Sequence, residues 1–143
     1  MKQALNLING IWQKSISGDF LLCTNPCNGE KIGEMTLSDE RDAAQAVNAA
    51  AVAFEEPLWS QNPRLRQMVL LRWADNLEGQ LDYLANLLTQ ENGKVIGQSR
   101  GEVLAAISEI RYYAGLTRFM PGHVFEVEPG IFSTILKEPA GVA

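Results

Sequence analysis

The sequence predicts an α+β fold in which N-terminal strands are followed by three to four helices and then by a protruding β-hairpin. Three observations carry this prediction. Asn9-Gly10 separates two short apolar pairs, residues 38–114 carry apolar side chains at helical spacing, and Pro129-Gly130 separates two segments rich in β-formers. A chain of 143 residues is long enough for one domain and too short for two of ordinary size.

Two hairpins are expected in the first third of the chain. Leu7-Ile8 and Ile11-Trp12 flank Asn9-Gly10, and a two-residue Asn-Gly turn between apolar pairs favours a tight hairpin. The second hairpin is expected to join residues 19–24 to residues 31–36, because residues 25–30 (NPCNGE) are dense in turn formers.

The first helix is expected to begin at Ser38. This residue is the predicted N-cap, and Asp39 and Glu40 then lie in the first turn, where the helix dipole favours negative charge. Five apolar residues fall on one face of this helix, namely Ala43, Ala46, Val47, Ala50 and Phe54. Pro57 is expected just past the helix end, in a loop that carries Trp59.

Further helices follow from Asn62-Pro63, which is predicted to supply an N-cap and a first helical residue. Gly79 is expected to break this helix, and Asn92-Gly93 is expected to end the next one, because glycine accepts the left-handed conformation of a helix end. The apolar positions predicted for these helices are Leu65, Met68, Val69 and Trp73, then Leu81, Leu84 and Leu88, then Val103, Ala106, Ile107, Ile110 and Ala114.

After Pro121-Gly122 the pattern returns to strands. Val124 to Glu128 and Ile131 to Glu138 are rich in β-formers and flank Pro129-Gly130, which predicts a long β-hairpin.

Composition narrows the functional classes. Hydrophobic residues make up 46% and charged residues 20% of the chain, which is typical of a soluble globular protein. The net charge of −5 and the absence of any Lys/Arg run argue against a nucleic-acid partner. The apolar stretches are too short to span a membrane, and the N-terminus lacks the apolar core of a secretory signal. We therefore expect a cytoplasmic protein.

The residues by themselves predict no active site. Cys23 and Cys27 lack the further ligands of a zinc site, since His123 is the only histidine, and a disulfide is disfavoured in a reducing compartment, so two unpaired thiols beside a turn are expected. No Gly-x-Gly-x-x-Gly follows a predicted strand. Asn92-Gly93-Lys94 lacks the glycines and the hydroxyl residue of a phosphate loop.

Six blocks of sequence, in order, resemble the aldehyde dehydrogenase family. Residues 8–12 (INGIW) are similar to the family's INGxW, and residues 25–33 (NPCNGEKIG) to NPxTGExIG, with Cys27 and Asn28 diverging. The helix 43–54 is similar to A-V-x-A-A-x-x-A-F. Residues 91–94 match ENGK, with Val95 where the family usually has proline. Residues 111–115 match RYYAG, and residues 137–142 resemble xEPxGV.

The resemblance implies an NAD(P)-dependent enzyme that oxidises an aldehyde to a carboxylic acid. In this family a cysteine attacks the aldehyde, a hydride passes to the nicotinamide, and a glutamate activates the water that releases the acid. These residues, the asparagine that holds the oxyanion and the nucleotide-binding core all correspond to positions beyond Ala143. Cys23 and Cys27 align with the early hairpin instead. We therefore expect no catalytic or cofactor-binding residue in this chain, no NAD or NADP bound to it alone, and no activity of the isolated chain.

The resemblance also implies a division of the chain. Residues 1–119 correspond to the N-terminal part of the cofactor-binding domain without its Rossmann core, and residues 120–143 correspond to the hairpin arm of the oligomerisation domain. The hairpin from Val124 to Glu138 is expected to pair with another subunit, since an exposed strand edge is a template for a second chain. The remaining C-terminal part of the enzyme is the other expected partner.

Some family members bind a structural monovalent cation, and the matching positions here are Cys23 and Thr24, through backbone oxygens, and Glu91. Oxygen ligands suit a hard cation. A further ligand would lie past Ala143, and the alternative is that Glu91 is a solvated acid at a helix end. Two other functions stay open for the chain as a whole: a non-catalytic assembly element that pairs through its hairpin, or a truncated remnant with an exposed apolar surface.

Overall fold

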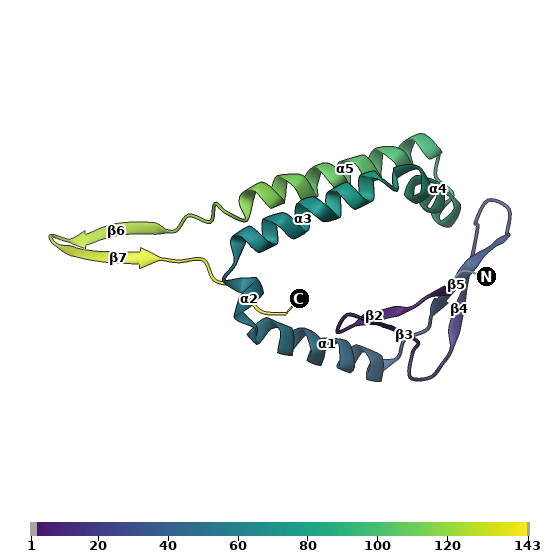
Figure 1. Cartoon of the computed structure of the whole chain (residues 1–143), viewed down its shortest axis with the longest axis horizontal. Helices are drawn as coiled ribbons and strands as arrows, with labels where there is room; N and C mark the ends of the chain where they lie inside the picture. The colour runs from purple at the N-terminus through teal and green to yellow at the C-terminus, as the bar shows by residue number, and fades with distance from the viewer. Residues whose placement is uncertain (1–2, 143) are drawn as a thin grey trace.

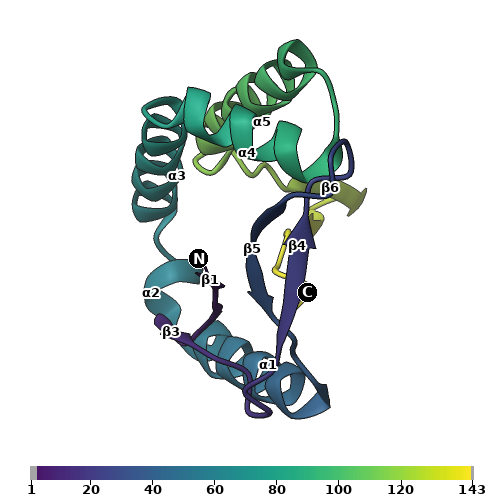
Figure 2. The ribbon, with the colours of Figure 1, turned by 90° about the vertical axis from the view of Figure 1, so that its right-hand side faces the viewer.

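The computed structural model describes residues 3–142, which form an open frame and a hairpin that projects from it (Figure 1). The N-terminal strands and α1 form one side of the frame, and α3, α4 and α5 form the other. β4 and β5 join the two sides at one end, as Figure 2 also shows, and the short helix α2 joins them at the other. The predicted α+β class is confirmed.

The first predicted hairpin is confirmed. β2 (Asn6–Ile8) and β3 (Ile11–Gln13) pair antiparallel, with Ile8 opposite Ile11. The two turn residues both adopt left-handed backbone angles, with φ of 51° at Asn9 and 76° at Gly10. That conformation is the one a two-residue hairpin turn requires, and Asn and Gly adopt it at least cost.

The second hairpin is also confirmed, and it belongs to a larger sheet. β4 (Phe20–Thr24) and β5 (Lys31–Thr36) pair antiparallel, and β1 (Gln3–Ala4) adds to β5 in parallel, giving the order β1-β5-β4. β1 was not predicted. A two-residue strand is too short to show alternation, and its position depends on pairing with β5, assisted by a 2.9 Å hydrogen bond from Thr36 Oγ1 to the Ala4 carbonyl oxygen.

Helix α1 (Glu40–Glu55) begins one residue later than predicted, because Asp39 and not Ser38 is its N-cap. The Asp39 carboxylate accepts a 3.3 Å hydrogen bond from the Asp42 N–H, and the Asp42 carboxylate accepts one of 3.0 Å from the Asp39 N–H. This reciprocal pair is a capping box. The Ser38 hydroxyl lies within 3.0 Å of the Asn6 side chain.

Residues 57–60 form a short helix, α2 (Pro57–Ser60), where a loop was expected. Pro57 occupies its first position, for which a fixed φ and a missing N–H are no handicap. The Arg66 guanidinium reaches back from α3 and donates hydrogen bonds of 2.6 Å to the carbonyl oxygens of Trp59 and Ser60. The last carbonyls of α2 are therefore satisfied by a side chain from the following helix, which fixes the corner of the frame.

The remaining helices are α3 (Pro63–Glu78), α4 (Leu81–Asn92) and α5 (Ile96–Leu116), and they pack on one another. The predicted break at Gly79 and the predicted stop at Gly93 are both confirmed, the latter with φ of 71°. The predicted N-cap Asn62 is confirmed as well, since its side-chain oxygen accepts a 3.0 Å hydrogen bond from the Leu65 N–H.

We expect Asn62→Ala to lower the free energy of unfolding by about 1 kcal/mol, because the first turn of α3 loses its side-chain acceptor. Asn62→Asp, which keeps an acceptor oxygen at the same place, should stay close to the parent protein. Urea denaturation of the three proteins measures the difference, and equal stability of the alanine and aspartate variants would contradict the capping role.

The buried core is small and lies mainly where α3, α4 and α5 meet. Ala74, Ala85, Ile107 and Ala114 are buried there, and Thr89 Oγ1 and Ser99 Oγ form a 2.8 Å hydrogen bond between α4 and α5. Small residues at these positions let the helices approach closely. The predicted apolar face of α5 is thus confirmed at Ile107 and Ala114.

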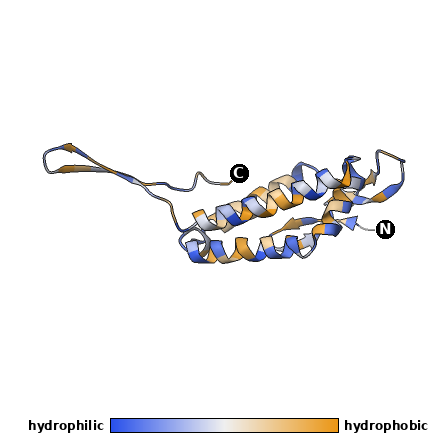
Figure 3. Ribbon diagram, turned by 90° about the horizontal axis from the view of Figure 1, so that it is seen from above, coloured by the Kyte–Doolittle hydropathy of each residue, from blue (hydrophilic) through white to orange (hydrophobic). Residues whose placement is uncertain are grey.

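The predicted apolar face of α1 has no such cover. We call Ala43, Ala46, Val47, Ala50 and Phe54 the α1 stripe, and all five residues are exposed. Val47 exposes 57% and Phe54 40% of its surface. Hydrophobic residues occur along the helices on both sides of the frame (Figure 3). Within the described residues, however, no other element covers the α1 stripe enough to bury it.

The predicted C-terminal hairpin is confirmed, with one boundary corrected. β6 (His123–Glu128) and β7 (Ile131–Ile135) form the arm, whose residues are all exposed. β7 ends at Ile135 and does not reach Glu138, because Ile135 already lies opposite His123, the first residue of β6. At the tip, the Glu126 carboxylate accepts a 2.9 Å hydrogen bond from the Gly130 N–H, beside a bulge between Glu126 and Glu128.

Candidate functional site

The turn between β4 and β5 is held by hydrogen bonds within it and lies against the end of α4. The Asn25 N–H donates to the Glu30 carbonyl oxygen at 2.8 Å, and the Asn25 side chain accepts from the Cys27 N–H at 2.9 Å. The turn thereby holds Pro26 and Cys27 beside Gly93. A side chain that hydrogen-bonds to the backbone two residues on is a common way in which asparagine fixes a turn.

Gly93 is required at this contact for two reasons. Its φ of 71° is left-handed, and a Cβ placed on it would lie 3.0 Å from Pro26 Cγ and 3.1 Å from Cys27 Sγ. Both cysteines are free, as predicted, and the Cys27 thiol lies 3.8 Å from the Gly93 carbonyl oxygen. Cys27 therefore serves as a packing contact between the sheet and α4.

The candidate cation ligands lie next to this contact. Cys23 and Glu91 line the same cavity of about 800 Å³, between β1, β5 and α4, whereas Thr24 is not among the lining residues. The pairing of β4 with β5 shifts register between Cys23 and Thr24, so the ladder is irregular there. The structure thus brings two of the three predicted positions to one cavity.

The expected ligands, one carboxylate and backbone oxygens, would be those of a hard monovalent ion and not those of a zinc site. Carboxylate and backbone oxygens suit such an ion. Among residues 3–142, no group of three or more His, Cys, Asp or Glu side chains is placed to hold a metal. A cation at Cys23 and Glu91 would therefore depend on backbone oxygens and on further ligands from elsewhere.

A buried carboxylate that the sequence analysis missed joins α1 to the N-terminal strands. Asp42 is 2% exposed, and its oxygens accept from Ser15 Oγ at 2.6 Å, from the Ile16 N–H at 3.0 Å and from the Asp39 N–H. We call these four residues the aspartate clamp. The hydrogen bond from the Ser15 hydroxyl, with those from the backbone, holds the pKa of Asp42 below its usual value of 3.8.

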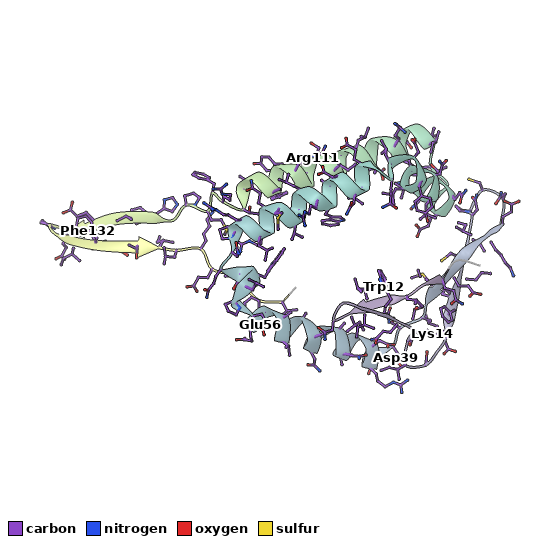
Figure 4. All side chains as sticks on the ribbon, viewed as in Figure 1. Trp12, Lys14, Asp39, Glu56, Arg111 and Phe132 are labelled. Carbon is purple, nitrogen blue, oxygen red and sulfur yellow. The ribbon has the colours of Figure 1, made fainter. Side chains whose placement is uncertain are left out.

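The aspartate clamp is structural. It lies at the N-terminal end of α1, where Figure 4 labels Asp39, and Lys14 is close by. In the same view Trp12 projects into the opening of the frame. Trp12 is 65% exposed. The only signal for the clamp was Asp42 at the third helical position, since Ser15 is distant in sequence. Among residues 3–142, the Cys27 thiol has its hydrogen bond with the Gly93 carbonyl oxygen. No helix among residues 3–142 is long and apolar enough to cross a membrane.

Comparison with known proteins extends these observations. Residues 12–143 match the model of the aldehyde dehydrogenase family. Malonate-semialdehyde dehydrogenase 2 of Bacillus cereus is 36% identical over 140 residues, which are 96% of this chain and 28% of that protein.

Solved structures agree with the sequence comparison. The NAD-dependent aldehyde dehydrogenase from Sinorhizobium meliloti matches with a TM-score of 0.91 and 26% identity, over 96% of this chain and 28% of that one. Betaine aldehyde dehydrogenase from Staphylococcus aureus, in complex with NAD+, matches with a TM-score of 0.88 and 30% identity, over 94% and 28%. The chain thus spans about 28% of the length of these relatives. The chain belongs to the aldehyde dehydrogenase family and corresponds to its N-terminal segment.

Proposed function

We propose that this chain is the N-terminal portion of an NAD(P)-dependent aldehyde dehydrogenase, which oxidises an aldehyde to a carboxylic acid, and that the chain alone is inactive. The observation that carries the proposal is the match of nearly the whole frame and arm to an NAD-dependent aldehyde dehydrogenase, at a TM-score of 0.91. NAD or NADP would supply the hydride acceptor in the complete enzyme, in the cytoplasm. This chain's residues would shape and support the site without touching the aldehyde.

The proposed division follows the frame and the arm. Residues 1–119 would form the outer part of the cofactor-binding domain, and residues 120–143 would belong to an oligomerisation domain. The division is supported by the arm, which projects from the frame and exposes all its residues.

A chimera tests the proposal. In it, this chain replaces the matched segment of the Bacillus cereus relative, and NADH formation is followed with an aldehyde panel. We expect aldehyde-dependent NADH formation by the chimera and none by the 143-residue chain. A folded, oligomeric chimera without activity would contradict the proposed function, and activity of the isolated chain would contradict its inactivity.

The cavity lined by Cys23 and Glu91 is proposed as the cation site of the complete enzyme, with the backbone oxygen of Thr24 as a neighbouring ligand. In the chimera, replacing choline chloride by potassium or sodium chloride at constant ionic strength should raise the Tm by a few degrees, because an ion that binds only the folded state stabilises it. Glu91→Gln should abolish the rise. Glu109→Gln, which removes an exposed charge from α5, should leave it unchanged. An equal rise in all three proteins would contradict the site.

The arm is proposed to pair with another subunit, through residues within Val124 to Glu138. Phe125, Ile131 and Phe132 expose 49%, 53% and 64% of their surfaces, an unusual density of apolar side chains for a free hairpin. The two outer strand edges also offer unpaired backbone groups to another strand. The same surface would serve the alternative function, in which the chain acts as a non-catalytic assembly element.

Light scattering during size-exclusion chromatography tests the arm. We expect the chimera to be oligomeric, and Phe132→Asp to reduce its oligomeric state, because a charge would be buried in the contact. Thr117→Ser, within the frame, is the control and should leave the assembly intact. An unchanged oligomer in the Phe132→Asp chimera would exclude the arm as the pairing surface.

A further inference from the structure

We propose that Asn9 is a modification site, at which the side-chain amide condenses with the Gly10 backbone nitrogen and the turn of the β2–β3 hairpin becomes isoaspartyl. The hairpin then opens, so the stability of the chain falls with its age. The proposal is independent of the proposed function, because it needs no cofactor, no aldehyde and no further part of the enzyme.

The reaction needs only the two turn residues and water. The Gly10 nitrogen attacks Cγ of Asn9, and the new N–C bond closes a five-membered succinimide. The bond from Cγ to Nδ2 breaks, and Nδ2 leaves as ammonia with the proton that the Gly10 nitrogen loses. Water then opens the ring at either carbonyl carbon, which gives aspartate or isoaspartate. Glycine hinders the attack least among the residues that can follow asparagine, because it carries no Cβ.

The chain contains three Asn-Gly pairs, at positions 9–10, 28–29 and 92–93. All six residues are exposed, so neither sequence nor exposure distinguishes the pairs. The hydrogen bonds of the two reacting groups, the asparagine side-chain amide and the glycine N–H, do distinguish them.

The pair at 28–29 is held by hydrogen bonds at both reacting groups. The Gly29 N–H donates to the Asn25 carbonyl oxygen at 2.8 Å. The Asn28 side chain donates to the Glu30 carboxylate at 2.9 Å and accepts from the Glu30 N–H at 3.0 Å. Attack by the Gly29 nitrogen therefore requires that these hydrogen bonds break first.

The pair at 92–93 is held in the same way by the end of α4. The Gly93 N–H donates to the Thr89 carbonyl oxygen at 2.8 Å, and the Asn92 side-chain amide donates to the Leu88 carbonyl oxygen at 3.3 Å. The Pro26 side chain also lies beside Gly93. The helix end and the neighbouring turn would both have to open before this pair could react.

The pair at 9–10 has none of this protection. Among residues 3–142, neither the Asn9 side chain nor the Gly10 N–H forms a hydrogen bond. A Cβ built on Gly10 would meet no atom within 4 Å, so the space beside the attacking nitrogen is open. The pair also forms the tip of a two-residue turn, where few contacts oppose a change of backbone angle. Asn9 is therefore the reactive asparagine of the three.

Conversion to isoaspartate would remove the turn. The isoaspartyl residue carries one more carbon atom in the backbone, whereas this turn depends on two consecutive residues with left-handed φ. Ile8 precedes the turn, is 7% exposed and lies opposite Ile11, and β2 packs on α1. Loss of the turn would thus expose a buried side chain and weaken the contact of the hairpin with α1.

Ageing of the 143-residue chain tests the proposal. The chain is incubated at mildly alkaline pH with and without urea, and peptide mapping by mass spectrometry follows each Asn-Gly pair. Without urea, we expect Asn9 to convert at least about tenfold faster than Asn28 or Asn92, because the hydrogen bonds at those sites must open first. In urea the three rates should converge.

A matched variant tests the effect on the hairpin. Asn9→Gly keeps a residue that accepts the left-handed turn and removes the amide. The urea midpoint of the parent chain should fall during incubation, and that of Asn9→Gly should stay constant. Conversion of Asn9 no faster than that of Asn28 and Asn92 in the absence of urea would overturn the site. An equal fall of the midpoint in Asn9→Gly would overturn the effect on the hairpin.

Discussion

Gly93→Ala should destabilise the chain by about 2 kcal/mol. About 1 kcal/mol comes from placing a Cβ on a residue with left-handed φ. The remainder comes from overlap of the new methyl group with Pro26 Cγ and Cys27 Sγ, which lie 3.0 Å and 3.1 Å from its position. Urea denaturation of the 143-residue chain measures the loss.

Two controls separate these causes. Gly29→Ala introduces a methyl group at φ of 74° with no atom within 4 Å, so it should cost only the backbone contribution. Cys27→Ala removes the thiol that the new methyl group meets, so the double variant should recover part of the loss relative to the sum of the two single changes. Equal losses for Gly29→Ala and Gly93→Ala would show that the sheet does not press on the end of α4.

Asp42→Ala should lower the denaturation midpoint further than Asn62→Ala does. The carboxylate is the acceptor for the Ser15 hydroxyl and for the N–H groups of Ile16 and Asp39, and Ser15 is itself 5% exposed. Its removal leaves the buried Ser15 hydroxyl and two part-buried N–H groups without this acceptor, which costs more than the loss of the single part-buried hydrogen bond at Asn62. Ser15→Ala removes one donor and keeps the acceptor, so it should be milder.

The pH dependence of the same clamp has a defined sign. The pKa of Asp42 in the folded chain lies below its ordinary value of 3.8. The contribution of Asp42 to the free energy of unfolding is therefore complete above pH 3.8 and is lost as the pH falls through the pKa of the folded chain. Asp42→Asn should make stability less sensitive to acid below about pH 4. Asp19→Asn, which removes an exposed carboxylate, should keep the acid sensitivity of the parent chain. A parallel pH profile for Asp42→Asn would contradict the clamp.

Local signals in the sequence predicted much of the fold. Asn9-Gly10, Asn62 and Gly93 were each identified because a residue type matched a backbone demand, namely two left-handed turn residues, an N-cap and a left-handed helix end. The errors occurred where two neighbouring residues suit the same role and a contact with a third residue decides which of them takes it. Ser38 and Asp39 are both good N-caps, and Asp39 is used because Asp42 completes the reciprocal pair.

Other elements depend on contacts that sequence patterns do not show. The two residues of β1 become a strand through β5, and α2 is held by a guanidinium from the following helix. For the candidate site, the family resemblance pointed to Cys23 and Glu91, and the structure brings both to one cavity. The aspartate clamp was missed, because Ser15 and Asp42 lie 27 positions apart and neither belongs to a motif.

Hydrogen exchange of α1 tests most directly whether the frame is built to be covered by the rest of an aldehyde dehydrogenase. The account predicts that amides of α1 exchange readily in the 143-residue chain, and that their protection rises by at least about tenfold in the active chimera. Amides of α5 should change far less, since α5 already packs on α3 and α4. Equal protection of α1 in both proteins would contradict the account.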